Sequence, residues 1–284
     1  MTDHKKTALI DVGGGFRAIF GAGVLDRCQE DGVEFDHVYG VSAGSANLTS
    51  FLARQHGRNH TFYTQYAFRK EYASMDSYIH NGNFANLDYV YGTLSNHDGE
   101  YPVDYQAFAD NPTDFTVIAC NANNGEAHYF SKDEVHYDNF GIMKASSAVP
   151  VACQPYVIDG VPYYDGGIAD PVPVQRALDD GAERVVLVLT RLKDVLREQS
   201  KDVAPSVILR RSYPAAAERL LNRYRTYNDE VALAKQYEAE GKVLILAPED
   251  LYGLSTLSKT YEGLERMYRA GYGAAERITP FLAS

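Results

Sequence analysis

The sequence predicts an α/β protein, built as a three-layer α/β/α sandwich around a mostly parallel central sheet. Three observations predict this fold: short apolar runs typical of strands buried on both faces, helical patterns between those runs, and the regular alternation of the two along the chain. Right-handed crossovers between the strands are expected with it. The predicted strands are residues 8–12, 37–41, 115–119 and 185–189, with a late one at 243–246.

The segments between the strands carry apolar residues every three or four positions, which is the spacing of an amphipathic helix. Several of them end near a glycine, a common helix stop signal. The last one contains a stripe formed by Leu257, Tyr261, Leu264, Tyr268 and Tyr272. The predicted helices are residues 16–28 before Gly32, a segment from Ala46 to near Gly57, residues 173–180 before Gly181, residues 215–240 and residues 257–275.

The chain of 284 residues has no internal repeat, low-complexity tract or flexible linker, which favours a single domain. Strand–helix alternation occupies residues 7–192, and residues 193–284 form a mainly helical extension with one late strand, packed on the same domain. Residues 58–113 are a polar, tyrosine-rich insertion that we expect to pass over the sheet edge. It is either a lid facing a substrate or an ordinary helical insertion with its tyrosines at the core–surface boundary. These tyrosines are Tyr63, Tyr66, Tyr72, Tyr78, Tyr89, Tyr91, Tyr101 and Tyr105.

The charge balance argues against polyanionic partners, because 27 basic residues face 38 acidic ones and the net charge is −11. A dense group of arginines is interpreted as a solvated helix face. Three cysteines form neither a disulfide framework nor a metal-ligand pattern. With neither a signal peptide nor an apolar run long enough for a membrane span, a cytoplasmic protein is expected. The arginines are Arg210, Arg211, Arg219, Arg223 and Arg225.

The stretch Gly40-Val41-Ser42-Ala43-Gly44 follows an apolar strand and opens a helix, which is the context of a G-x-S-x-G elbow. A serine on such a sharp turn is held in a strained backbone conformation, and small flanking residues let the turn close. Its hydroxyl stands at a helix N-terminus, where the aligned peptide dipoles favour a developing negative charge. Ser42 is therefore a candidate nucleophile, and the alternative is a plain tight turn.

Three consecutive glycines, Gly13, Gly14 and Gly15, lie at an earlier strand-to-helix junction. They expose backbone N–H groups that can hold an anion. One interpretation is an oxyanion hole. The other is a dinucleotide-binding loop, because Gly13, Gly15 and Ala18 match G-x-G-x-x-[GA]. That alternative is disfavoured, since the next strand ends at Ser42 and its acidic neighbours sit at the opposite end.

The third motif, Tyr163-Tyr164-Asp165-Gly166-Gly167, follows a predicted hairpin that turns at residues 159–160. No histidine follows Asp165, although α/β-hydrolases place one after the acid. The serine elbow also comes after only the second strand, too early for that fold. A Ser-His-Asp triad is thus disfavoured, and an aspartate acting directly on the serine is the simpler alternative.

In this order the three motifs resemble the patatin-like phospholipase family, whose pattern is G-G-G-x-[RK]-G, then G-x-S-x-G, then a distal D-G-[GA]. Residues 145–150 are similar to its A-S-x-A-x-P segment, and residues 170–174 are similar as well. The chain departs from the pattern at Ala18, where the family usually has glycine. The resemblance covers about residues 7–192 and implies that they form a patatin-like catalytic domain.

The resemblance implies a Ser-Asp dyad with Ser42 as nucleophile and Asp165 as base. The oxyanion hole would come from N–H groups around Gly14 and Gly15, with Gly13 shaping the loop. Arg17 would either brace that loop or meet a phosphate head group. Burial would raise the pKa of Asp165 and make it a better base. The residues that would support the turns are Gly40, Gly44, Gly166 and Gly167.

The resulting hypothesis is a serine hydrolase of phospholipase, lysophospholipase or esterase type that cleaves acyl esters of lipids through an acyl-enzyme intermediate. It needs no cofactor and no metal. Its partners would be a lipid or a small acyl ester, with transient contact to a membrane surface and no nucleic acid. The alternative is a non-catalytic lipid- or acyl-binding protein on the same scaffold.

Overall fold

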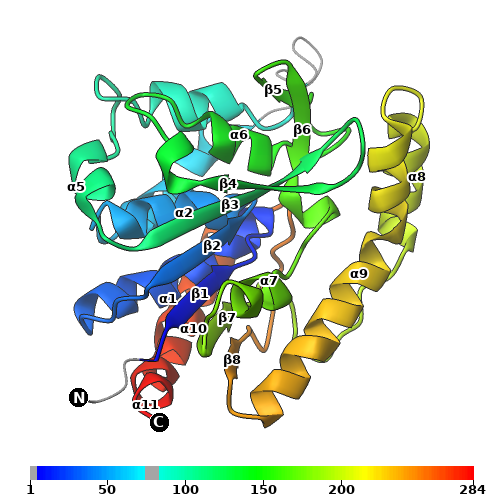
Figure 1. Ribbon diagram of the computed structural model, residues 1–284. Coiled ribbons are helices and arrows are strands. Elements are labelled where there is room, and N and C mark those ends of the chain that lie inside the picture. Colours follow the sequence, from blue (N-terminus) through cyan, green and yellow to red (C-terminus); the bar gives the residue numbers. More distant parts are fainter. Residues whose placement is uncertain (1–4, 74–82) are drawn as a thin grey trace.

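The computed structural model describes residues 5–73 and 83–284 and has one central sheet with helices on both faces (Figure 1). The strand order is β5-β6-β3-β2-β1-β7-β8, and β4 pairs with β3 outside this path. The five strands expected from the sequence form its parallel part. They are β1 (Thr7–Asp11), β2 (His37–Val41), β3 (Asp114–Asn121), β7 (Arg184–Val188) and β8 (Val243–Leu246).

Three antiparallel strands complete the sheet. The expected hairpin is present as β5 (Tyr156–Ile158) and β6 (Val161–Asp165). Its turn residues, Asp159 and Gly160, have φ values of 50° and 79°, which are those of a tight hairpin turn. Strand β4 (Ala127–Ser131) pairs antiparallel with β3. It was not predicted, because most of its side chains are only half-buried and no continuous apolar run marks it.

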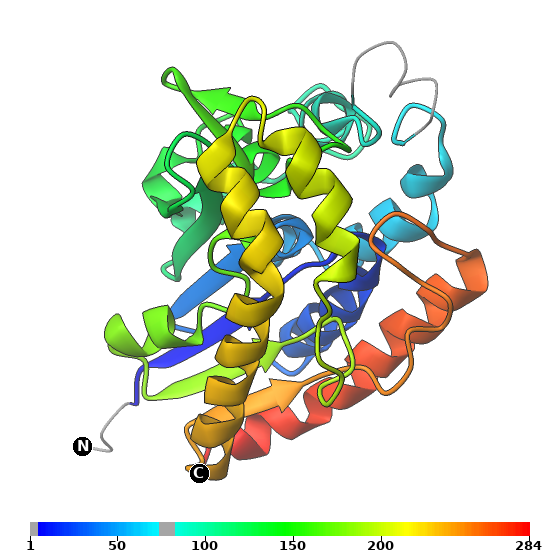
Figure 2. The ribbon, with the colours of Figure 1, turned by 90° about the vertical axis from the view of Figure 1, so that its right-hand side faces the viewer.

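The two faces of the sheet are visible in the alternation along β1. Leu9 packs into one hydrophobic cluster, whereas Ala8 and Ile10 pack into another. Helices α1, α2 and α10 contribute to the first cluster, and α7 and α9 to the second. Figure 2 shows the long α9 crossing in front of the sheet. The predicted three-layer sandwich, with its helical C-terminal region, is confirmed. These helices are α1 (Ile19–Glu30), α2 (Ala43–Leu52), α7 (Val174–Asp179), α9 (Pro214–Ala239) and α10 (Tyr261–Ala274).

Two predicted helix boundaries are wrong. Helix α2 ends at Leu52, five residues before Gly57, which instead adopts a left-handed conformation and precedes the next helix. Helix α10 begins only after Thr260, whose Oγ1 accepts a hydrogen bond from the N–H of Gly263 at 3.1 Å and caps the helix. Leu257 therefore lies in an exposed loop rather than on the helical stripe. Helices that the sequence analysis did not resolve are α3 (Arg58–Thr64), α5 (Tyr105–Asp110), α6 (Gly141–Ser147), α8 (Ser200–Leu209) and α11 (Ile278–Leu282).

The tyrosine-rich insertion is helical in its described part and adds no strand to the sheet there. Three of its tyrosines, Tyr63, Tyr72 and Tyr91, line an apolar cavity, while Tyr89 and Tyr105 sit at the boundary between core and solvent. The described part is thus a helical insertion with some tyrosines at the core–surface boundary, and whether it faces a substrate stays a prediction. Tyr78 lies outside the described residues.

The C-terminal helix α10 packs closely along α1. A Cβ atom on Gly271 would overlap the carbonyl oxygen of Phe20, and one on Gly23 would overlap that of Tyr268. The two backbones are therefore as close as glycine permits. Two residues beyond Gly271, Gly273 is exposed and meets no atom within 4 Å. No helix of the described residues is both long and apolar enough to cross a bilayer.

These two glycines make a matched pair for testing that the last helix belongs to the folded core. Gly271→Ala should lower the free energy of unfolding by about 1–3 kcal/mol, because the new methyl group forces α10 away from α1. Gly273→Ala should leave it unchanged or raise it by up to about 1 kcal/mol, since alanine favours a helix. Urea denaturation measures both. Equal stabilities for the two variants would contradict this packing.

Candidate active site

The serine elbow joins β2 to α2 at a strained residue. Ser42 has φ 55° and ψ −132°, a conformation that non-glycine residues rarely adopt. Its neighbours hold it there: the N–H of Ser42 donates to Ser146 Oγ at 2.8 Å, and its carbonyl oxygen accepts from Ser45 Oγ at 2.6 Å. Strain of this kind persists only where the surroundings fix it, and it is common at functional sites.

The two glycines of the elbow are required by packing. A Cβ on Gly40 would lie 2.5 Å from the Cα of Ser45, inside the first turn of α2. A Cβ on Gly44 would overlap the carbonyl oxygen of Asp11 at the end of β1. The G-x-S-x-G spacing thus allows α2 to start directly against two neighbouring strands.

The glycine loop after β1 packs against this elbow. Gly13, Gly14 and Gly15 all have positive φ, at 65°, 119° and 60°. The N–H of Gly13 donates to Asp11 Oδ1 at 2.9 Å, and its carbonyl oxygen accepts a hydrogen bond from the hydroxyl of Thr190. Within the described residues, the N–H groups of Gly14 and Gly15 donate to no protein atom. Gly13 therefore anchors the loop through its two hydrogen bonds, and the N–H groups of Gly14 and Gly15 remain available to a ligand.

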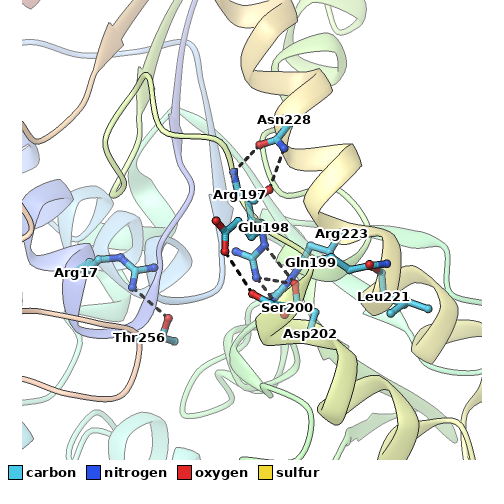
Figure 3. Close-up of polar contacts among 10 residues, drawn as sticks. All are labelled: Arg17, Arg197, Glu198, Gln199, Ser200, Asp202, Leu221, Arg223, Asn228 and Thr256. Atoms are coloured by element: carbon cyan, nitrogen blue, oxygen red, sulfur yellow. Dashed lines mark hydrogen bonds and ion pairs between the residues drawn. The ribbon is translucent and has the colours of Figure 1, made fainter.

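Arg17 lies beneath the glycine loop and is buried. Its Nε donates to the carbonyl oxygen of Thr190 at 3.0 Å. Its Nη1 donates to Thr256 Oγ1 at 3.3 Å (Figure 3). Burial, together with the positive charges nearby, lowers the pKa of Arg17 to about 10, so the guanidinium stays charged at neutral pH. Of the two roles considered for Arg17, these contacts favour the brace. No described contact links it to the elbow itself.

The pairing of β3 explains how residues 42 and 165 meet. Strand β4 occupies one edge of β3 over Thr116–Cys120. Strands β2 and β6 therefore both pair with the other edge of β3. Because β2 is parallel to β3 and β6 is antiparallel to it, the C-terminal ends of β2 and β6 face each other. In this register Val41 pairs with Ile118, and Asp165 pairs with Ala119, which is the next residue of β3.

The Ser42 hydroxyl lies close to the carboxylate of Asp165 and favours its charged form. Both residues are largely buried, at 8% and 6% exposure. Asp165 Oδ1 also accepts the N–H of Gly167 at 2.8 Å. Burial raises the pKa of Asp165, while the nearby Ser42 hydroxyl and the positive charge of Arg223 oppose that increase. A Cβ on Gly166 would overlap the carbonyl oxygen of Ile118, which explains the glycine there.

Two residues that the sequence analysis gave no role connect these parts. Ser146 is fully buried; its hydroxyl donates to the carbonyl oxygen of Ile118 at 2.6 Å and accepts the N–H of Ser42. Asp11, also fully buried, accepts Asn47 Nδ2 at 2.9 Å in addition to the loop N–H, and burial raises its pKa to about 6. Ser146 could have been found from the sequence because it belongs to the A-S-x-A-x-P segment. Asp11 lies two residues before Gly13, the first glycine of the loop.

The stretch after Asp165 is tied to the C-terminal helix α9. Asp170 accepts a hydrogen bond from the hydroxyl of Tyr129 at 2.7 Å, and Glu230 on α9 accepts the N–H of Val172 at 2.7 Å. The two carboxyl groups are close neighbours. Burial and the neighbouring Asp170 raise the pKa of Glu230, and burial raises that of Asp170. The C-terminal region thus contacts the segment that carries Asp165.

Ser42 lies where two cavities meet. One, of ≈ 120 Å³, is mostly apolar and extends between α2, α6 and the tyrosine-rich insertion. The other, of ≈ 750 Å³, opens on the far side of the glycine loop and includes Asp165 and several basic residues. The apolar cavity is lined by residues that include Phe62, Tyr63, Tyr72, Phe84, Leu87, Val90, Tyr91, Phe140 and Met143.

The comparisons with known proteins agree with the fold and the motifs. The family model for patatin-like phospholipases matches residues 12–178, more than half of the chain. The chain therefore belongs to the patatin-like phospholipase family. Residues 213–283 match a domain of unknown function, DUF6363. The second match covers all of α9 and α10, outside the part that the family model describes.

One curated relative, the uncharacterized protein YjjU of Escherichia coli strain K12, is 32% identical over 190 residues. That match covers 65% of this chain and 52% of YjjU, so the chain spans about half of the relative's length. The crystal structure of VipD from Legionella pneumophila is similar with a TM-score of 0.50 and 15% sequence identity. It covers 97% of this chain and 67% of VipD, and at this identity the likeness concerns the fold alone.

Proposed function

We propose that this protein is a serine hydrolase that cleaves acyl esters of lipids, with Ser42 as nucleophile and Asp165 as its base. The observation that carries the proposal is the proximity of these two buried side chains, at an elbow flanked by the glycine loop. Family membership supports the lipid acyl hydrolase class. The dyad and the roles of its residues rest on the geometry of the site.

In the proposed reaction, Ser42 Oγ attacks the ester carbonyl carbon and its proton passes to the carboxylate of Asp165. The carbonyl oxygen becomes an oxyanion next to the free N–H groups of Gly14 and Gly15. As the C–O bond breaks, Asp165 returns the proton to the departing alcohol, leaving Ser42 acylated. Water then attacks the acyl-enzyme with the same base assistance and releases the fatty acid.

A carboxylate of ordinary pKa is a weak base toward a hydroxyl, and the site offsets this in two ways. Burial raises the pKa of Asp165, which increases its affinity for the serine proton. The strained elbow fixes Ser42 Oγ against the carboxylate, so little orientation has to be gained during attack. Donors fixed in place around the oxyanion stabilise the charge without reorganisation, an effect worth about 3–4 kcal/mol for each donor.

The apolar cavity supports an acyl chain as the bound group. It begins at Ser42 and Gly15 and is lined mainly by aromatic and aliphatic side chains. A chain placed there would keep its ester carbonyl at the elbow. The same cavity is the observation that favours the second candidate, a non-catalytic acyl-binding protein. That candidate does not account for the strain at Ser42 or for the proximity of its hydroxyl to Asp165.

Lipid substrates also require the protein to reach a lipid surface, and we propose that α8 makes this transient contact. Three of its apolar side chains, Val203, Val207 and Ile208, are 42%, 68% and 61% exposed. The same helix contributes Lys201 to the cavity beside Ser42. A Val207→Asp/Ile208→Asp variant should hydrolyse lipids in vesicles more slowly than wild type and a short soluble ester at the same rate. An equal effect on both substrates would argue against surface contact.

The dyad is tested by substitution. Ser42→Ala should abolish hydrolysis of p-nitrophenyl esters and labelling by a fluorophosphonate, and Asp165→Asn should lower kcat/KM by about 10²–10⁴-fold because the general base is lost. Ser212→Ala and Asp98→Asn, both at exposed positions, serve as controls and should keep full activity. Full turnover in either dyad variant would exclude the mechanism.

The pH profile offers a second readout of Asp165. Because burial raises the pKa of this carboxyl group, the base form is lost as the pH falls through that raised value. The kcat/KM of the wild type should therefore decline on the acid side at a pH above the ordinary range of an aspartate, near 4. A profile that stays flat down to pH 4 would contradict the assignment of Asp165 as the base.

A further inference from the structure

The larger cavity beside Ser42 is a positively charged cleft in an acidic protein. Five basic side chains line it, whereas its carboxylates are Asp165 and Asp202. The net charge of the chain is −11, so this concentration of positive charge opposes the overall balance. Positive charge gathered in a concave site attracts anionic ligands. We call this cavity the cationic cleft; its basic residues are Arg17, Arg191, Arg197, Lys201 and Arg223.

Asp202 does not neutralise the cleft. It is buried on α8 and receives two guanidinium groups, with Arg197 Nη2 at 2.9 Å from Oδ2 and Arg223 Nη2 at 2.5 Å from Oδ1 (Figure 3). One carboxylate balances only one of these charges. Asn228 on α9 fixes the backbone of Arg197 from both sides, accepting its N–H at 2.8 Å and donating to its carbonyl oxygen at 3.0 Å.

The remaining positive charges lack carboxylate partners. Within residues 5–73 and 83–284, Arg191 and Lys201 form no ion pair. Mutual repulsion is also visible in the pKa values: the charges of Arg191, Arg197 and Arg223 lower the pKa of Arg17, after the effect of burial. Guanidinium groups held together against their repulsion are typical of phosphate and carboxylate sites.

A second, independent feature points to a ligand. Tyr227 on α9 is 7% exposed and lines the cationic cleft, yet its buried hydroxyl has no hydrogen-bond partner among the described residues. The guanidinium carbon of Arg191 lies 5.9 Å from the centre of its ring. An unpaired buried hydroxyl is costly, and an oxygen of a ligand in the cleft would satisfy it.

We propose that the cationic cleft binds the phosphate of the lipid substrate, so that the protein hydrolyses acyl esters of phosphate-bearing lipids whose head groups carry no cation. This inference rests on the proposed function. Ser42 lines both cavities, so an ester bound at its hydroxyl has the acyl cavity on one side and the cleft on the other. A glycerophospholipid has this arrangement, with the acyl chain and the phosphate on opposite sides of the ester.

The charges of the cleft also select among phospholipids. Arg191 and Lys201 suit a phosphodiester with an uncharged head group such as glycerol. A choline or ethanolamine head group would bring an ammonium ion toward these residues, while the nearby Asp202 is already occupied by two arginines. Anionic phospholipids should therefore be hydrolysed faster than zwitterionic ones.

The test compares two substrates with the same acyl chain and ester, 1-oleoyl-lysophosphatidylglycerol and 1-oleoylglycerol, in mixed micelles of one neutral detergent. For the wild type, kcat/KM should be at least tenfold higher for the phospholipid. Arg191→Ala should lower this ratio about tenfold, and Tyr227→Phe several-fold without loss of thermal stability, since the hydroxyl has no protein partner to lose. The matched control is Arg225→Ala, which removes an exposed arginine from α9, the helix that carries Tyr227. This variant should keep the wild-type ratio.

The outcomes separate the two proposals. If neither lipid is hydrolysed, the proposed function fails. If both are hydrolysed with a ratio near one, or if Arg191→Ala and Tyr227→Phe leave the ratio unchanged, the hydrolase stands and the phosphate site is overturned. Inorganic phosphate at millimolar concentration should raise KM for the phospholipid only. Acceleration of 1-oleoylglycerol hydrolysis by phosphate would instead make the cleft a site for a free anion and would also overturn the inference.

Discussion

The end-to-end meeting of β2 and β6 along one edge of β3 is the constraint on which the site depends. It brings Ser42 and Asp165 together across more than a hundred residues of sequence, without any helix or loop having to carry them. Two features keep this meeting point in place. Ser146 bridges the elbow to β3, and glycines at positions 44 and 166 allow backbone to pass directly against backbone. The strained serine is a consequence of this close packing.

The C-terminal region contributes to the site as well as to the core. Helix α9 supplies Arg223 and Tyr227 to the cationic cleft and, through Glu230, holds the segment that follows Asp165. The family model ends at residue 178, and the whole of α9 falls in the match to a domain of unknown function. The proposed head-group selectivity therefore resides largely outside the segment that defines the family, and relatives with a different C-terminal region would share the hydrolytic geometry but not the charge of the cleft.

The sequence was sufficient for the parts of the molecule governed by local patterns. Buried parallel strands are continuous apolar runs, so all five were found, and the strand-to-helix pattern correctly put Ser42 at an elbow between β2 and α2. The contacts of Arg17, Arg223 and Tyr227 could not be predicted, because they depend on which distant segments pack together. Arg223 belongs to an arginine group interpreted as a solvated face, which is wrong for this residue: its side chain is 18% exposed and paired with Asp202. The negative net charge of the whole chain likewise did not indicate a local cleft of positive charge.

We expect an ester carbonyl bound at Ser42 to turn its oxygen toward the glycine loop and its acyl chain toward the apolar cavity. A crystal structure of the protein inactivated with a long-chain alkyl fluorophosphonate tests it most directly. The account predicts phosphorus bonded to Ser42 Oγ, the phosphoryl oxygen at about 3 Å from the N–H groups of Gly14 and Gly15, and the alkyl chain among the aromatic residues of the insertion. Modification of a different residue, or a phosphoryl oxygen directed away from the loop, would contradict it.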